Sequence, residues 1–224
     1  QVFGGISRYF YQLISRLNET GEANARVDVF CSNNCYYHTW PEASRRYFFK
    51  NWNFRGRNRI IERINRIRSL SVLESQSFDL FHPTYNNPYF LEKLDLKPFV
   101  ITVHDMIHEL YPDLPNAAKE AANKKEMILN ANGIIVPSEH TKNDILKLYD
   151  IDSDKINVIY HGRPCFSDKD ISNHIKLPEQ YLLFVGQRNY YKNFTLLLKA
   201  FAMLKKDFPE LYIICVGGGS LSNQ

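Results

Sequence analysis

Short apolar runs of strand length recur along the chain and alternate with segments whose apolar residues have helical spacing. The runs are 26–30, 78–84, 99–105, 133–138, 156–162, 181–186 and 211–219. They are nearly continuous in apolar residues and several are rich in Val, Ile and Phe, which is typical of parallel strands covered on both faces. Helical patterns occupy 6–17, 117–131, 139–149 and 194–206. The alternation predicts an α/β fold with parallel sheets, and Ser138 is the expected N-cap of the third helix.

The alternation lapses once, between two prolines. Residues 163–180 (RPCFSDKDISNHIKLPEQ) are polar and predict a linker. We therefore expect a first domain over 1–162 and the beginning of a second domain over 181–224. The second sheet has only two strands before the sequence ends, so we expect the second domain to be incomplete.

Charge is concentrated in one segment. The 224 residues carry a net charge of +4, but Arg45 to Arg68 contain eight arginines and one lysine against one glutamate. This segment therefore has a charge of +8, and the remaining residues sum to −4. No window of the sequence has the roughly 18 apolar residues that a membrane span needs. The four cysteines are too sparse for a disulfide scaffold, and Cys31, Cys35 and His38 lack a common zinc spacing. We expect a cytoplasmic protein without a metal site.

The basic segment also contains an amphipathic helical pattern. Isoleucines at 60, 61, 64 and 67 form a stripe with Leu70, and Arg59, Arg63 and Arg66 flank it. One interpretation is a surface helix that packs its isoleucines on the sheet and leaves the arginines in solvent. Another is a helix that lies on an anionic membrane surface. Nucleic acid is a third partner for such a patch, but no recognised nucleic-acid motif accompanies it.

The strand at 181–185 leads into a loop with the composition of an anion site. The strand ends at Gly186, Arg188 and Lys192 follow, and a helix begins near Phe194 with Asn193 as its expected cap. Ligands of α/β sheets bind at the carboxyl ends of the strands, and helix N-termini attract anions. An arginine and a lysine added there favour a phosphate ligand. The alternative is a solvated basic loop.

Three further strand or helix ends carry candidate chemistry. Gly4 and Gly5 begin a helix, where backbone amides could donate to an oxyanion, or where they form a plain turn. His104 and Asp105 end a strand, where they could bind a substrate hydroxyl or simply cap the strand. The third place is the glycine run at 217–219, which could lie flat against a base or ribose, or form a turn.

Five motifs in this order give the chain a family resemblance. GGISRY, TVHD, VPSEHTKNDI, VIYHG and especially FVGQRNYYKNF resemble the group 1 (family four) glycosyltransferases of the GT-B fold. The likeness spans nearly the whole chain. It is greatest to bacterial enzymes of O-antigen or capsule synthesis, often mannosyltransferases.

The resemblance implies retaining transfer of a sugar, without a metal or other cofactor, from a GDP- or UDP-linked donor to a glycan or lipid-linked acceptor. It implies these roles: Arg188, Lys192, Gly4 and Gly5 on the donor diphosphate, His104 and Asp105 at the transferred sugar, Gly217 and Gly218 at the nucleoside. No nucleic-acid partner is implied, and the protein would be cytoplasmic or peripheral on the inner membrane face.

The chain departs from the family pattern in two respects. Gln187 stands where many relatives have the arginine. The family's first strand and its acidic donor-sugar motif have no counterpart in residues 1–224, so we expect a piece of an enzyme. The alternatives are another GT-B enzyme, such as a sugar-nucleotide epimerase, and a non-catalytic module that docks on a membrane or partner.

Overall fold

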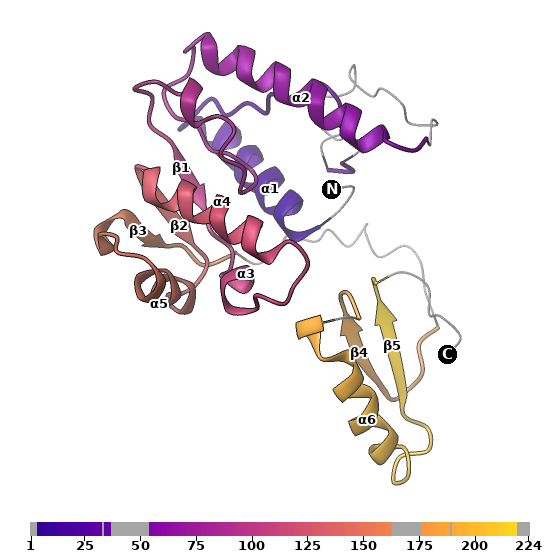
Figure 1. Ribbon diagram of the computed structural model, residues 1–224. Coiled ribbons are helices and arrows are strands. Elements are labelled where there is room, and N and C mark those ends of the chain that lie inside the picture. The colour runs from indigo at the N-terminus through magenta and orange to yellow at the C-terminus, as the bar shows by residue number, and fades with distance from the viewer. Residues whose placement is uncertain (1–3, 33, 37–53, 163–175, 189, 219–224) are drawn as a thin grey trace. The chain divides into compact units, whose positions relative to one another are not determined.

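A computed structural model describes residues 4–32, 34–36, 54–162, 176–188 and 190–218. The chain divides into two compact units, residues 1–161 and 162–224 (Figure 1). Each contains a parallel sheet with helices packed on it, so the predicted α/β class is confirmed.

The first unit is built on a three-stranded parallel sheet in the order β1-β2-β3. Its strands are β1 (Val100–Thr102), β2 (Gly133–Val136) and β3 (Ile156–Val158). Ile101 pairs with Ile134 and Ile135 pairs with Asn157. Both pairings are parallel, so the carboxyl ends of all three strands lie at one edge of the sheet. This edge carries the first group of candidate site residues.

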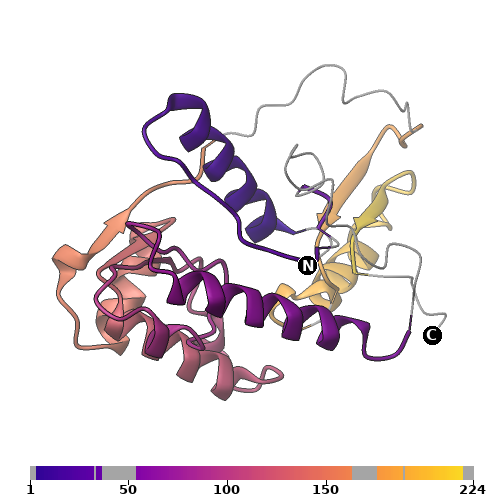
Figure 2. The same cartoon turned by 90° about the horizontal axis from the view of Figure 1, so that it is seen from above.

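Helices cover both faces of this sheet. They are α1 (Gly5–Thr20), α2 (Arg57–Glu74), α3 (Ile107–Leu110), α4 (Ala117–Asn130) and α5 (Glu139–Leu148), with 3₁₀ turns η2 (Leu91–Lys93) and η3 (Ser153–Lys155). Figures 1 and 2 show α1 on one side of the sheet and α4 on the other. Ser138 caps α5 as predicted, because its side chain accepts a hydrogen bond from the Thr141 amide.

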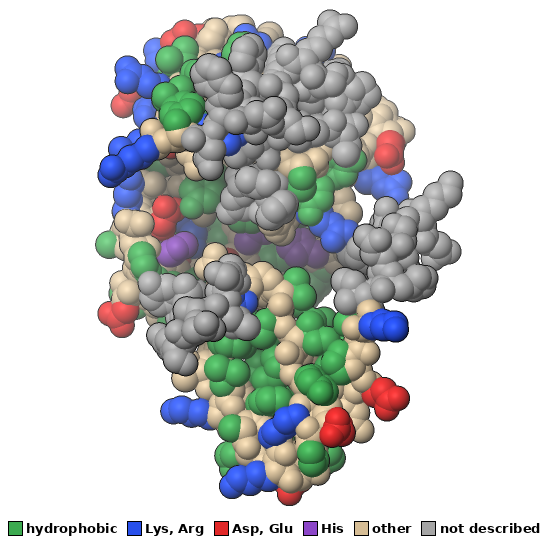
Figure 3. Space-filling view, turned by 90° about the vertical axis from the view of Figure 1, so that its right-hand side faces the viewer, with side chains coloured by type: hydrophobic (Ala, Val, Ile, Leu, Met, Phe, Trp, Pro, Cys, Tyr) green, Lys and Arg blue, Asp and Glu red, His purple; other side chains and the backbone are tan. Residues whose placement is uncertain are grey.

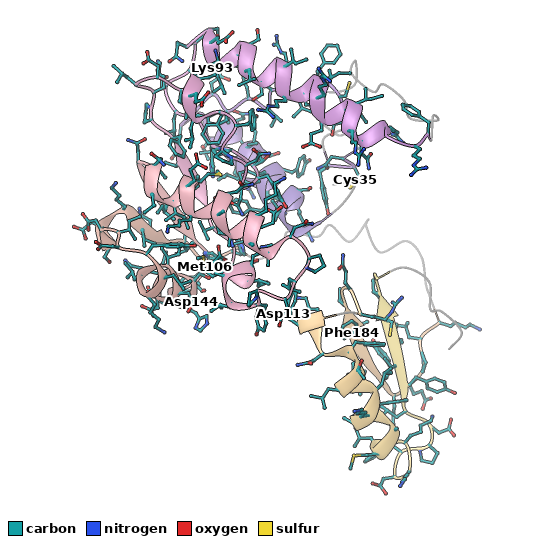
Figure 4. The ribbon with its side chains drawn as sticks, in the orientation of Figure 1. Cys35, Lys93, Met106, Asp113, Asp144 and Phe184 are labelled. Carbon is teal, nitrogen blue, oxygen red and sulfur yellow. The ribbon has the colours of Figure 1, made fainter. Side chains whose placement is uncertain are left out.

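One contiguous hydrophobic core joins the sheet to α4, α5 and the end of α2. Its buried members include Leu73, Phe90, Ile101, Met127, Ile128, Ile134 and Ile145. Met106, labelled in Figure 4 just before α3, is also buried in this core. The turn that follows β1 is therefore attached to the hydrophobic core through the buried side chain of Met106.

The second unit pairs two parallel strands with one helix. Its elements are β4 (Tyr181–Val185), η5 (Tyr190–Lys192), α6 (Phe194–Leu204) and β5 (Tyr212–Val216). Phe184, labelled in Figure 4, packs against Phe194 of α6 with ring centroids 4.8 Å apart. The other face of the sheet is exposed and apolar (Figure 3). Its exposed residues are Tyr181, Leu183, Val185, Tyr212 and Val216.

Two predicted strands are not strands in the structure. Residues 26–30 form no strand, and the backbone at their end is bound by a side chain. The Asn65 Oδ1 accepts from the Phe30 and Cys31 amides at 3.1 and 2.8 Å, and its Nδ2 donates to the Cys31 carbonyl at 2.7 Å.

The run 78–84 is reduced to a single parallel bridge between Phe81 and Phe99. The Val100 amide donates to the Phe81 carbonyl at 3.0 Å. The next ladder bond would need an N–H at position 83, and Pro83 has none. Pairing therefore ends after one bridge.

The interpretation that the isoleucine stripe packs on the sheet is wrong for two of its members. Ile60 is 45% exposed and Ile67 is 63% exposed. Instead, α2 is anchored near its C-terminal end, where Leu73 is buried and Ser69 accepts a 2.7 Å hydrogen bond from the Tyr89 hydroxyl. The helix therefore presents Ile60 and Ile67 to solvent.

Parts of four predictions lie outside the described residues. They are positions 163–175 of the linker, positions 45–53 of the basic segment, Gly219 of the glycine run and His38 of the group with Cys31 and Cys35. Asn193 does precede α6, but its side chain makes no capping hydrogen bond because its backbone is left-handed, with φ 52°.

Candidate functional site

His104 and Asp105 follow β1 at the carboxyl edge of the first sheet. The amide of Val103 still donates to the Ile135 carbonyl at 2.9 Å, so the sheet holds the residue just before His104. The Asp105 Oδ1 accepts a 3.1 Å hydrogen bond from the Ile107 amide and thereby closes the turn into α3. Asp105 thus has a structural task at the strand end, beside any role toward a ligand.

The His104 imidazole is packed between aromatic rings. Its ring centroid lies 5.1 Å from that of Tyr9, edge to face, and 5.8 Å from that of His161. Its buried Nε2 has no hydrogen-bond partner in the described part of the chain. Burial, and secondarily the nearby His161, lower the pKa of His104, while Asp105 opposes that shift. A neutral imidazole with an unpartnered buried nitrogen is suited to bind a hydroxyl.

A hydrogen-bonded chain lies beside His104. The Thr102 hydroxyl lies 3.1 Å from the Tyr9 hydroxyl and 3.0 Å from His82 Nε2. Burial, and secondarily His104, lower the pKa of His82 to about 4, so this ring is neutral at physiological pH. Phe10 packs edge to face on His82 at 5.1 Å. These hydrogen bonds fix α1 to β1, the strand that His104 follows.

Sequence reasoning missed four members of this cluster: Tyr9, His82, Thr102 and His161. The sequence did contain a signal for two of them, because His82 and His161, like His104, lie near the ends of apolar runs. Parallel pairing brings such strand ends to one edge of the sheet. Figure 3 shows histidine side chains grouped on one face of the molecule.

The glycine pair lies at the N-terminus of α1, one turn before Tyr9. Gly4 precedes the helix and its carbonyl accepts from the Arg8 amide at 3.1 Å. A Cβ on Gly5 would meet no atom within 4 Å. The amides of the first helical turn have no intrahelical acceptors, so the space beside Gly5 is suited to an anion.

The second unit brings Arg188, Gly217 and Gly218 together. The Arg188 guanidinium donates to the carbonyl oxygens of Gly217 and Gly218 at 2.5 and 3.0 Å. These residues lie at the carboxyl ends of β4 and β5, which are paired in parallel. Gly217 and Gly218 have φ of 88° and 75°, which glycine alone adopts without strain. Arg188, predicted for the diphosphate, is therefore a neighbour of Gly217 and Gly218, predicted for the nucleoside.

Lys192 lies farther along the same loop, at the end of η5 and two residues before α6. Its ammonium is exposed and lies 4.9 Å from the centroid of the Tyr191 ring. Exposure next to a helix N-terminus leaves this charge accessible to an anionic ligand.

The arginines of α2 form a separate surface. Arg59, Arg63 and Arg66 line an open groove of about 440 Å³ together with Ile67 and Leu70. The groove also contains Glu62, and the Arg66 guanidinium lies 5.4 Å from the Tyr89 ring centroid. We name this surface the α2 groove.

No group of three His, Cys, Asp or Glu side chains in the described residues is arranged to hold a metal ion. In the same part of the chain, no helix combines the length and the apolar character required to cross a membrane.

Comparison with known proteins identifies the family to which the chain belongs. Residues 167–224 match the family described as glycosyl transferases group 1, and residues 3–165 match Glycosyltransferase Family 4. The second match covers most of the chain, so the chain belongs to Glycosyltransferase Family 4. Family membership confirms the resemblance found in the motifs and the α/β fold class of GT-B type.

Solved structures of TarM are among those that resemble the chain. One is a point mutant of S. aureus TarM in complex with Fondaparinux, alpha-GlcNAc-glycerol and UDP, with 18% identity and a TM-score of 0.48. The match covers 70% of this chain and 32% of the TarM chain. A second TarM structure has 18% identity, a TM-score of 0.46, and coverages of 68% and 31%. The chain thus spans about a third of these proteins. A search of the curated proteins found no match.

Proposed function

We propose that this chain acts in a retaining glycosyltransferase that moves a sugar from a nucleotide-diphosphate donor to an acceptor hydroxyl. The observation that carries the proposal is the pair of consecutive family matches, one on each unit, both to glycosyltransferases. The first unit would supply the acceptor side and contacts to the transferred sugar. The second would supply contacts to the donor nucleotide.

The donor diphosphate would bind at the loop that follows β4. Arg188 provides a planar fork of donors and Lys192 a point charge, both ahead of the N-terminus of α6. Breaking the bond between the sugar and the diphosphate places negative charge on the leaving group. Preorganised donors stabilise that charge, and each is worth on the order of 3 kcal/mol. Gly217 and Gly218 would border the nucleoside.

The transferred sugar would be bound by the first unit. His104 offers a buried, unpartnered Nε2 on a ring whose pKa is lowered, so the neutral ring can hydrogen-bond a sugar hydroxyl. The open space beside Gly5 would accept a phosphate oxygen against the first amides of α1. Cationic side chains and amides perform the charge stabilisation in this scheme, so we propose that no metal is required.

The finer assignment rests on the motifs. GGISRY, TVHD and FVGQRNYYKNF resemble bacterial enzymes of O-antigen and capsule synthesis, so we propose mannose as the sugar and a surface polysaccharide as the product. The acceptor would then be a glycan or a lipid-linked glycan, and the reaction would take place in the cytoplasm or on the inner membrane face.

The reaction is tested by incubating the protein with GDP-mannose and candidate acceptors in EDTA and determining the anomeric configuration of the product by NMR. Transfer that keeps the donor's anomeric configuration in EDTA supports the proposal. Transfer with inversion, or transfer that EDTA abolishes, contradicts the stereochemical or metal-independent part of it.

A second candidate activity is membrane docking through the α2 groove. The observation that favours it is the exposure of Ile60 and Ile67 beside Arg59, Arg63 and Arg66. Exposed apolar side chains flanked by arginines suit a surface of anionic lipid. Co-sedimentation with anionic vesicles that salt weakens would support docking, and equal binding to neutral vesicles would contradict it.

A further inference from the structure

A buried ion pair contacts the turn that follows His104. Lys124 of α4 and Glu109 of α3 are joined at 2.9 Å, and their side chains are only 2% and 4% exposed. Lysine and glutamate are rarely buried to this extent unless they are paired. No motif assigned to the proposed function includes either residue.

The ammonium group also contacts the strand-end turn itself. The Lys124 Nζ donates to the carbonyl oxygen of Asp105 at 2.9 Å. The same turn is closed by the bond from the Ile107 amide to Asp105 Oδ1, and Met106 within it is buried. The carbonyl that Lys124 binds belongs to the residue next to His104, so the ion pair contacts the backbone directly beside the residue from which the imidazole projects.

The second carboxylate oxygen of Glu109 also has a hydrogen-bond partner. The hydroxyl of Tyr149 donates to Glu109 Oε1 at 3.5 Å, while Oε2 receives Lys124. Burial, and secondarily Glu109, raise the pKa of Tyr149 to about 12, so the phenol keeps its proton and stays a donor. The network links α3, α4 and the end of α5 to one carbonyl group.

Stability alone does not account for charges in this position. Burying two charges removes their hydration, and well-packed apolar residues of similar volume are often as stabilising or more so. What apolar residues cannot supply is a directed donor to the Asp105 carbonyl. Apolar residues at these positions would therefore lose the hydrogen bond from Lys124 to the Asp105 carbonyl, which holds the turn.

We propose that Lys124 is a positioning residue for His104: paired with Glu109, it holds the Asp105 carbonyl and so fixes the turn from which the imidazole reaches the transferred sugar. This inference rests on the proposed function for the identity of what His104 binds. Lys124 itself contacts no substrate in this scheme.

The test is a titration of the His104 ring signals by NMR in the 224-residue chain without donor, assigned with His104→Gln. Lys124→Met removes the contact, and Lys124→Met combined with Glu109→Leu removes it without leaving a buried unpaired charge. Lys124→Arg keeps a charged donor. Lys119→Met, on the exposed surface of the same helix, is the matched control. Thermal unfolding is recorded for each variant.

We expect the pKa of His104 to rise toward its ordinary value in Lys124→Met and in the double variant, because the freed turn exposes the ring. Burial is the main cause of the depressed pKa, and His161 and Asp105 act on the same ring. Lys124→Arg and Lys119→Met should keep the native value. The double variant should also recover stability relative to Lys124→Met.

A double variant with the native His104 pKa would overturn the proposal, since the pair would then be structural only. That variant remains decisive if Lys124→Met does not fold. Because the titration contains no donor, its outcome is independent of whether the chain binds a nucleotide sugar. A raised pKa without donor binding would keep the positioning role and refute the proposed function.

Discussion

The guanidinium of Arg188 donates a 2.5 Å hydrogen bond to the carbonyl oxygen of Gly217. One residue follows β4 and the other follows β5, so the bond fastens two neighbouring strand ends to each other. A second donor reaches Gly218 at 3.0 Å. The arginine proposed for the diphosphate therefore also shapes the glycine turn proposed for the nucleoside. Loss of Arg188 should disturb both parts of the donor site.

Gly218→Ala should loosen the end of this sheet. A Cβ at this position would lie 3.1 Å from the Gly186 carbonyl oxygen and 3.2 Å from the Arg188 amide nitrogen, with φ at 75°. Both neighbours are backbone atoms that cannot rotate away. A left-handed non-glycine residue costs about 1–3 kcal/mol. Hydrogen exchange of the Gly186 amide, which donates to Val216 at 2.8 Å, measures the effect.

We expect protection of that amide to fall about tenfold or more in Gly218→Ala. Gly162→Ala is the control, because a Cβ there meets no atom within 4 Å and the backbone does not require glycine. Equal protection in both variants would show that the turn is not constrained as described.

The neutral His82 ring should make the protein acid-sensitive. Its pKa is lowered from 6.5 to about 4. Between these values the unfolded state binds a proton that the folded state does not, so the free energy of unfolding falls as pH decreases. The full effect is about 3 kcal/mol, gained above pH 6.5 and lost by about pH 4. Urea unfolding followed by circular dichroism from pH 7.5 to 4.5 measures it.

His82→Gln separates this proton from the carboxylates that titrate over the same range. Comparison at pH 7.5 gives the cost of the substitution alone. Below pH 6.5 the variant should lose stability less steeply than the native chain. Parallel pH profiles would contradict the assignment of a neutral buried His82.

Tyr9→Phe should weaken the attachment of α1 to β1. The substitution removes the hydroxyl that lies 3.1 Å from the Thr102 hydroxyl but keeps the ring that packs on His104 and His161. One such hydrogen bond is worth about 1 kcal/mol, so the free energy of unfolding should fall by about that amount. Tyr160→Phe, at a position that is 68% exposed, is the control and should change stability by less than about 0.5 kcal/mol. Equal losses in both variants would count against the Thr102 contact.

Neutralising the α2 groove should reduce binding to anionic vesicles. Each arginine near a charged membrane contributes about 1 kcal/mol, so changing Arg59, Arg63 and Arg66 to Gln should weaken binding about 100-fold. Vesicle co-sedimentation at low salt measures it. Neutralising the exposed lysines Lys119, Lys147 and Lys155 removes the same charge elsewhere on the first unit. If both triple variants bind equally weakly, net charge and not the groove is responsible.

The sequence predicted the elements whose pattern is decided locally. The run around 133–138 is apolar throughout and Ser138 stands at the start of the next helix, and both β2 and the cap are present. One strand prediction failed where a distant residue decides, because Asn65 binds the amides at the end of the run 26–30. The other failed on a local feature, because Pro83 within the run 78–84 has no N–H for the next ladder bond.

The candidate site divides in the same way. Strand-end positions directed attention to His104, Asp105 and Arg188, since parallel sheets bind ligands at their carboxyl ends. The partners of these residues could not be predicted, because each comes from another part of the chain. Lys124 reaches the Asp105 carbonyl across 19 positions, and Tyr9 reaches Thr102 across 93. Such contacts depend on tertiary packing and have no local pattern.

Binding of a nucleotide-sugar diphosphate by the loop after β4 is tested by calorimetric titration with GDP-mannose, GDP and UDP-sugars. The native chain is compared with Arg188→Ala and Lys192→Ala, and with Lys199→Ala as an exposed, charge-matched control in the same unit. We predict that one nucleotide binds the native chain and the control, and that affinity falls about 100-fold or more in both site variants. Donor affinity unchanged in Arg188→Ala and Lys192→Ala would contradict it.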